Sequence, residues 1–163
     1  MNLLREYIRE SLLVEAIEFR EIDSPLKYSA GNVKRLAYCD SAVTEPPEHQ
    51  DAYFKEWEKM REGEKEIIPG VSDVCIIGFL DYHSIGKTHD GKGTVWYIDY
   101  MKTRTDSRGK GVASELLEQF YETVAQPGDD VNFGKMMEPQ IGHLMKKMKE
   151  KYPEIYTTGK VWY

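Results

Sequence analysis

Residues 107–114 read SRGKGVAS, a short stretch with two glycines, two cations and no acidic residue. The run before it, TVWYIDYMKT at 94–103, alternates in polarity and predicts a strand, and residues 111–125 predict a helix. The first turn of a helix has unpaired N–H groups and a partial positive charge, and glycine lets a ligand approach them without a Cβ in the way. The stretch therefore predicts an anion site suited to a phosphate or pyrophosphate. The alternative is a surface turn whose cations are solvated.

Known phosphate-binding patterns narrow this prediction. A Walker A loop would need a glycine five residues before Gly86, where the chain has Asp81. A dinucleotide-binding fingerprint would need a glycine or alanine at position 114, which is Ser114. The pattern Arg/Gln-x-x-Gly-x-Gly/Ala is matched at every fixed position, by Arg108, Gly111 and Ala113.

The segment 94–121 resembles motif A of the GNAT acetyltransferase superfamily. Members commonly have a strand, this glycine turn and then a helix with a pair of leucines, which here are Leu116 and Leu117. The order of the surrounding elements extends the resemblance to most of residues 16–163. It implies a single GNAT-like α/β domain of mixed α+β type, with helices flanking a mostly antiparallel twisted sheet.

The resemblance also implies an N-acetyltransferase that uses acetyl-CoA and no metal. The cosubstrate would lie between the fourth and fifth strands, with its pyrophosphate on the backbone of the glycine turn and Arg108 organising the loop. Strand backbone would pair with the pantetheine arm and hold the developing oxyanion. The residues expected to bind the cosubstrate are Met101, Thr103, Arg108, Gly109, Lys110, Gly111, Val112 and Ala113.

A neutral amine would attack the thioester directly, so a base must first remove a proton. Strand alternation places Tyr97, Asp99, Met101 and Thr103 on one face. In similar proteins an acid at the position of Tyr97 or Asp99 often serves as this base, and Asp99 is the first candidate. Alternatively, Asp99 attracts a cationic substrate or pairs with a neighbour.

The CoA thiolate needs a proton as it leaves. Tyr152 and Tyr156 follow the expected fourth helix and are candidate donors, although core packing is the alternative role for each. His83 and His89 flank a glycine-rich hairpin loop at 83–93 and could act on substrate, or they are solvated loop histidines.

Composition limits the partners. The 163-residue chain has 28 acidic against 22 basic residues, which argues against nucleic acid and tilts towards cationic or neutral partners. Suitable acceptors are polyamines, aminoglycosides, protein lysines or a protein N-terminus. No apolar run reaches the roughly 18 residues of a membrane helix. Both a monomer and a homodimer fit the sequence.

The two cysteines, Cys39 and Cys75, show neither metal-ligand spacing nor a disulfide framework. They are expected to be free core residues in a reducing, cytoplasmic setting.

The rest of the chain alternates between helical and strand-like periods. Helices are expected over 31–43, 49–62 and 139–151, and strands over 16–22, 73–82, 131–136 and the last residues, TTGKVWY.

Residues 1–15 precede this domain and form an expected amphipathic helix. The segment resembles head-targeting leaders of proteins packaged in tailed phages, because Leu13-Val14-Glu15 stands before the small residue Ala16. Packaging in a phage head, with a mature chain that begins at Ala16, would follow. The alternative is a helix that packs on the domain or on a second subunit.

A non-catalytic role remains the alternative function. The fourth helix carries Met145 and Met148 near positions where similar proteins have aromatic residues. The chain would then be an acetyl-CoA-binding module, or a phage virion or interaction protein that reuses the fold.

Overall fold

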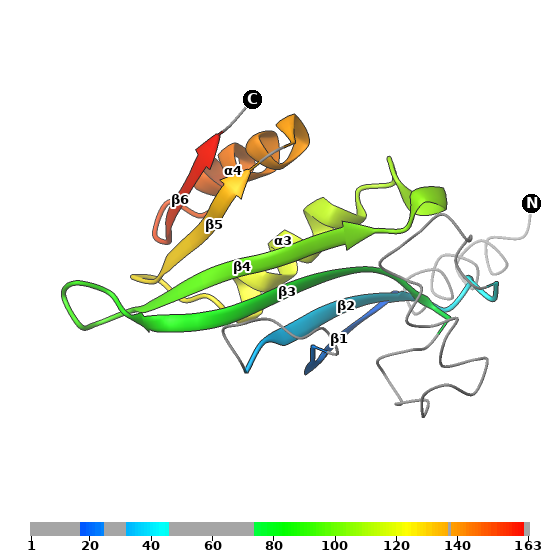
Figure 1. Ribbon diagram of the computed structural model, residues 1–163, viewed down its shortest axis with the longest axis horizontal. Helices are drawn as coiled ribbons and strands as arrows, with labels where there is room; N and C mark the ends of the chain where they lie inside the picture. Colours follow the sequence, from blue (N-terminus) through cyan, green and yellow to red (C-terminus); the bar gives the residue numbers. More distant parts are fainter. Residues whose placement is uncertain (1–16, 25–31, 46–73, 137, 162–163) are drawn as a thin grey trace, which may run out of the picture.

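The computed structural model describes residues 17–24, 32–45, 74–136 and 138–161. They form one six-stranded sheet with two helices on it (Figure 1). The elements are β1 (Ile17–Asp23), β2 (Lys34–Asp40), β3 (Ile76–Lys87), β4 (Thr94–Thr103), a short 3₁₀ turn (Thr105–Ser107), α3 (Val112–Thr123), β5 (Asp130–Met136), α4 (Pro139–Lys151) and β6 (Tyr156–Val161).

The sheet follows chain order, β1-β2-β3-β4-β5-β6. Strands β1 to β4 are successively antiparallel, whereas β4–β5 and β5–β6 are parallel pairs. Parallel neighbours need a crossover, and α3 and α4 provide the two crossovers. The expected GNAT-like domain, with a mostly antiparallel sheet flanked by helices, is confirmed.

The main core lies between the helices and one face of the sheet. Helix α3 packs against β2, β3 and β4, and α4 packs against β5 and β6. Leu116, Leu117 and Phe120 of α3 are fully buried in this core. The ring of Phe120 meets those of Tyr82 and Trp96 edge-on, at 5.0 and 6.2 Å between centroids. The apolar side chains that alternate along β3 and β4 therefore pack in the same core as those that repeat with the helical period of α3.

The helix expected over 31–43 is wrong, because Lys34–Asp40 is the strand β2. Residues 35–39 of this strand are all buried, since β2 lies between β1 and β3 and apolar clusters cover both of its faces. Burial on both faces removes the period-two alternation that identifies a half-buried strand. The apolar positions Val33, Leu36 and Ala37 then imitate a helical spacing.

Cys39 and Cys75 are bonded to each other, so the expectation of free cysteines is wrong. Their Cα atoms lie 4.8 Å apart, and the Asp40 N–H donates to the Cys75 carbonyl at 2.9 Å. The residues are 36 positions apart in sequence, and only the pairing of β2 with β3 brings them together. The pair lies in a second buried cluster, which also contains Ala37, Ile76 and Phe79.

The strand at 94–103 and the helix at 139–151 have the expected bounds. Strand β3 extends to Lys87 and so takes up the first part of the expected hairpin loop. The helix expected at 49–62, the helix in 1–15 and the leader lie outside the described residues. The cytoplasmic location and the packaging in a phage head stay predictions. None of the helices in the described part of the chain is long and apolar enough to cross a membrane.

Candidate active site

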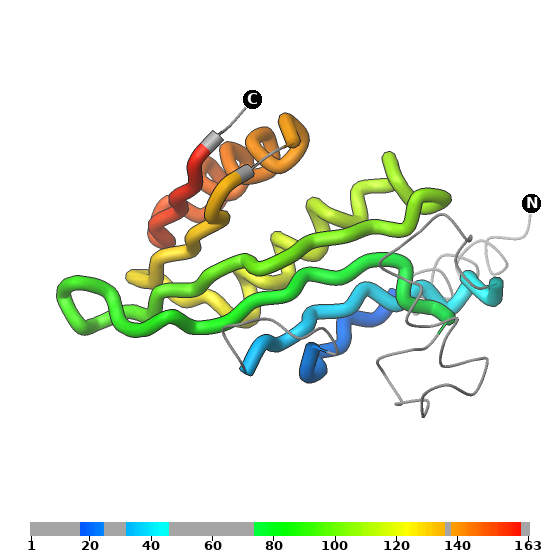
Figure 2. The backbone as a smooth tube through the Cα atoms, in the orientation of Figure 1, coloured from blue at the N-terminus to red at the C-terminus, as the bar shows by residue number. Residues whose placement is uncertain are grey.

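The centre of the sheet opens where β4 and β5 separate. These strands pair only over Val95–Tyr97 and 130–132, after which they diverge, as the smooth trace of Figure 2 shows. Gly134 of β5 has a φ of +61°, and a Cβ there would lie 2.3 Å from the Tyr97 hydroxyl oxygen. Only glycine fits this combination of backbone and close approach. Among the described residues, β4 beyond Tyr97 pairs with β3 on one side but has no neighbouring strand on the side of β5.

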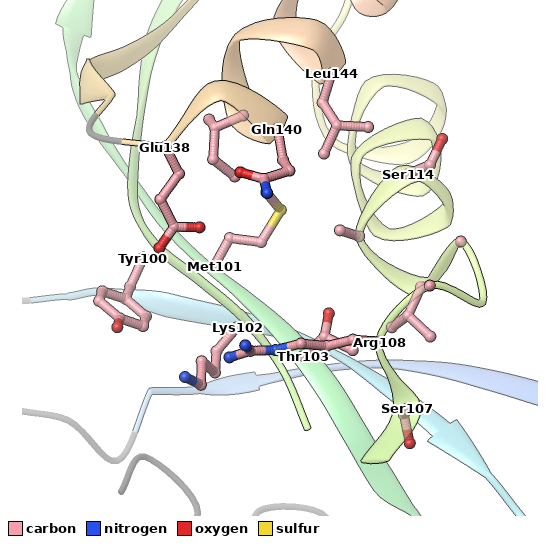
Figure 3. Close-up of a pocket in the computed structure, with 15 residues that line it drawn as sticks. Tyr100, Met101, Lys102, Thr103, Ser107, Arg108, Ser114, Glu138, Gln140 and Leu144 are labelled. Atoms are coloured by element: carbon pink, nitrogen blue, oxygen red, sulfur yellow. The ribbon is translucent and has the colours of Figure 1, made fainter. Parts of the chain in front are cut away.

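A cleft of about 470 Å³ occupies this opening. Its walls come from β4, the glycine turn, the start of α3 and the start of α4 (Figure 3). Of the residues expected to bind the cosubstrate, all except Lys110 line it: Met101, Thr103, Arg108, Gly109, Gly111, Val112 and Ala113. The remaining lining residues are Tyr100, Lys102, Ser107, Ser114, Glu138, Gln140, Ile141 and Leu144.

The glycine turn presents backbone to this cleft. Gly109 and Gly111 have φ angles of +78° and +82°, in the left-handed region that glycine adopts without strain. A Cβ at either position would meet no atom within 4 Å, so the space beside both glycines is open. Gly111 is the N-cap of α3, and no side chain caps the helix there. The helix therefore offers N–H groups and a partial positive charge beside the cleft.

Arg104, rather than Arg108, organises the turn. Its guanidinium is buried and donates to both carboxylate oxygens of Asp106, at 2.6 and 3.1 Å, and to the Glu45 carbonyl at 3.0 Å. The hydrogen bonds from Arg104 hold the pKa of Asp106 below its usual range. Arg108 is left exposed on the cleft wall.

A β-bulge in β4 changes which residues share a face. Asp81 pairs with Tyr100 and Tyr82 pairs with Ile98, so Asp99 is the extra residue. Ile98 and Met101 consequently both pack on the helix-side core, although simple alternation would separate them. The expectation that Met101 shares a face with Tyr97 is therefore wrong, whereas Asp99 contacts His83, the residue that pairs with Tyr97. The bulge breaks the period of two.

A second cavity, of about 240 Å³, adjoins the cleft and contains Asp99. The two share Tyr100, Met101, Glu138 and Ile141, so they meet along β4 and the start of α4. Ile98, Asp99, Phe133 and Lys135 complete the second cavity. A group held in the cleft near Met101 can thus be reached from the side of Asp99.

Asp99 is buried, with 8% of its side chain exposed, and its Oδ2 lies 2.6 Å from Nδ1 of His83. Burial raises the pKa of Asp99 and outweighs the opposing effect of the His83 hydrogen bond. A carboxylate with a raised pKa is a stronger base than an exposed one. His83 itself lies in β3 opposite Tyr97, not in the loop where the sequence placed it.

A comparison with protein families identifies the domain. The model of the acetyltransferase (GNAT) family matches residues 32–131, which is more than half of the chain. The chain belongs to the GNAT acetyltransferase family. No curated protein matches the sequence significantly. Among solved structures, a ribosomal-protein-alanine N-acetyltransferase from Brucella melitensis biovar Abortus 2308 is similar at 16% identity and a TM-score of 0.36, over 80% of this chain and 67% of that one.

Tyr152 lies outside both cavities of this GNAT domain. Its hydroxyl donates to Glu122 at 2.7 Å, and its ring stacks on Tyr121 with 5.1 Å between centroids. Burial raises its pKa, which makes ionisation harder. This position does not fit the proton-donor role that the sequence suggested. Tyr156 is exposed at 67% and borders a separate hollow at the start of β6.

Sequence reasoning missed several residues of the GNAT site. Glu138 and Gln140 come from the start of α4, which the motif does not include, and Arg104 looks like any solvated arginine in sequence. The contact between His83 and Asp99 depends on the register of β3 against β4. The polar residues of the expected strand and hairpin could be identified from the sequence. Which of them pair with one another could not.

Proposed function

We propose that this acetyltransferase transfers an acetyl group from acetyl-CoA to a primary amine. The proposal rests mainly on the cleft at the opening between β4 and β5, where an exposed strand edge and a helix N-terminus border the same space. Few ligands need both an anion site and an extended hydrogen-bonding edge. Acetyl-CoA combines a pyrophosphate with a pantetheine arm, whose amides can form hydrogen bonds to a strand edge as an added strand does.

The donor would be held by the residues that line the cleft. Backbone N–H groups of Gly109–Ala113 would receive the pyrophosphate, and Arg108 would add a full positive charge. The edge of β4 around Met101–Thr103 would bond the pantetheine amides. A backbone N–H of this edge would also stabilise the oxyanion that forms on the thioester carbonyl.

The acceptor would enter through the second cavity. Carboxylates of Asp99 and Glu138 favour an ammonium group there, although Lys135 offsets part of the charge. Asp99 would take a proton from the amine. The neutral nitrogen then forms a bond to the acetyl carbon and the C–S bond breaks. The second proton that the nitrogen loses as the amide forms passes to the released thiolate through water.

Calorimetric titration with acetyl-CoA and CoA tests the donor site. Arg108→Ala and Lys110→Ala form a matched pair, because both cations belong to the turn but only Arg108 lines the cleft. We expect Arg108→Ala to weaken binding about tenfold, as the loss of a charge-assisted hydrogen bond does. Lys110→Ala should bind like the wild type. Gly111→Glu should abolish binding, because it places a negative charge where the phosphates lie.

Release of CoA thiol in the presence of amines then tests transfer. The panel contains spermidine, an aminoglycoside, a lysine peptide and a peptide with a free N-terminus. Binding without transfer to any amine would favour the non-catalytic acetyl-CoA-binding module. No binding at millimolar acetyl-CoA would reject both functions.

A further inference from the structure

His83 contacts the carboxylate on which the proposed reaction depends. We propose that His83 is the positioning residue for Asp99, whose carboxylate it holds at the wall of the second cavity by a hydrogen bond from Nδ1–H. The inference rests on the proposed acetyl transfer, because it gives His83 a task only if Asp99 accepts a proton from the amine.

The chemistry of the pair fixes the direction of this hydrogen bond. An ionised carboxylate has no proton to donate, so the proton between Oδ2 of Asp99 and Nδ1 of His83 must come from the imidazole. The separation of 2.6 Å is short for a hydrogen bond, and bonds to an ionised group are shorter than neutral ones. Only 13% of the His83 side chain and 8% of the Asp99 side chain are exposed, so water competes little with the bond.

The bulge explains why Asp99 needs such a partner. As the extra residue of β4, it lies outside the regular register, and the ladder alone does not orient its side chain. His83 is in register with Tyr97, and their ring centroids lie 5.6 Å apart. The Tyr97 hydroxyl in turn approaches Gly134 of β5 so closely that a Cβ there would lie 2.3 Å from its oxygen. The neighbouring strands thus fix the imidazole, and the imidazole fixes the carboxylate.

Only Asp99 of the pair lines the second cavity. A carboxylate at the wall can meet the amine, whereas an imidazole behind it acts through the carboxylate. This arrangement makes His83 a positioning residue. Outer partners that orient metal ligands change activity roughly 10- to 100-fold when they are removed, and we expect an effect of this size for the partner of a base.

The surrounding charges set the expected pH behaviour. Burial raises the pKa of Asp99, the His83 hydrogen bond lowers it, and the buried Asp81 raises it further. Arg35 pairs with Asp81 at 2.8 Å and so limits that last effect. The other titratable groups around Asp99 come from β4, β5 and the start of α4, and they are Tyr97, Tyr100, Lys135 and Glu138. Loss of the His83 bond should therefore raise the pKa of Asp99.

The test compares His83→Asn with His83→Leu. The side-chain amide of asparagine can place a donor near the position of Nδ1, whereas leucine has no donor. With the best amine of the panel, His83→Leu should lower kcat roughly 10- to 100-fold, leave the KM for acetyl-CoA unchanged and move the acidic limb of kcat/KM to higher pH. In His83→Asn, the acidic limb of kcat/KM should lie at the same pH as in the wild type, and most of kcat should be retained.

Three results would overturn the inference. Wild-type activity in His83→Leu would show that Asp99 needs no partner. Equal losses of activity in both variants, with CoA binding intact, would show that the hydrogen bond from residue 83 does not support catalysis. In the wild type, nitrogen NMR of the His83 imidazole should show a proton on Nδ1. The variant Asp99→Leu should weaken the hydrogen bond of that proton. A bare Nδ1 would reject the bond even if His83→Leu fails to fold. A wild type inactive on every amine would reject the proposed function itself.

Discussion

Glu138 is one of four residues that border both cavities, and it is the acidic one among them. It is exposed at the start of α4, so its attraction for an ammonium group is moderated by water. We expect Glu138→Gln to raise the KM for a cationic amine roughly three- to fivefold, which corresponds to less than about 1 kcal/mol, with little change in kcat. Steady-state kinetics at two salt concentrations would check this.

The control for Glu138 is Glu150→Gln, an exposed carboxylate further along α4 that lines neither cavity. It should leave the KM unchanged. Added salt should reduce the difference between wild type and Glu138→Gln, since screening weakens exposed charge pairs. A similar rise in KM for both variants would mean that the net charge of the protein, rather than Glu138, attracts the amine.

Asp99 is expected to lower the stability of the fold at neutral pH although acetyl transfer depends on it. Because burial raises its pKa, the folded state binds a proton more readily than the unfolded state. The stability that this group contributes is then present at low pH and is lost as pH rises through the folded pKa. We expect Asp99→Asn to raise the melting temperature at pH 7 and to lower acetyl transfer about 10²- to 10⁴-fold. Thermal unfolding between pH 4.5 and 8 and the thiol-release assay would check both.

Asp130, at the start of β5, is a matched control for this effect. Burial also raises its pKa, against an opposing hydrogen bond from Thr158, and it lines neither cavity. Like Asp99→Asn, Asp130→Asn should raise the melting temperature at pH 7 and flatten its dependence on pH. Acetyl transfer should continue. If Asp99→Asn proved less stable than the wild type at pH 7, the buried carboxylate would have to be favourable in the fold.

At the scale of elements, local sequence predicted the strand, turn and helix over 94–125 because each depends on its own residues. The identity of β2 was not predictable in the same way, since its burial depends on strands and side chains far along the chain. The bulge at Asp99 depends on the register of β3 and β4. Seven of the eight expected cosubstrate residues line the cleft because the motif is local, whereas His83 and Glu138 required the tertiary fold.

The bond between Cys39 and Cys75 ties the end of β2 to the start of β3 across 36 positions. Closing a loop of this length restricts the unfolded chain and should stabilise the fold by roughly 2–4 kcal/mol. We expect reduction to lower the urea midpoint by a corresponding amount. The double variant Cys39→Ala/Cys75→Ala should lose the dependence on reductant. Free thiols in the native, unreduced protein, detected by alkylation and mass spectrometry, would contradict the bond.

At the scale of the whole molecule, the domain has two parts that meet at the cleft. The antiparallel part, β1 to β4, and the parallel part, β5 and β6, are joined in the sheet by pairing over Val95–Tyr97. Helix α3 lies against the first part and α4 against the second. The cleft takes residues from both parts, so a ligand that fills it acts as a further connection between them.

Binding of CoA should therefore stabilise the entire domain. At a CoA concentration 100 times its dissociation constant, mass action adds about 2.7 kcal/mol to the stability of the folded state. For a chain of this size we expect a rise in melting temperature of roughly 5–10 °C, and none in Gly111→Glu. Hydrogen exchange should show added protection in β4, in the first turn of α3 and in the start of α4, because all three line the cleft. Protection confined to α3 would mean that CoA contacts one wall only, and that the two parts of the sheet are not connected through the ligand.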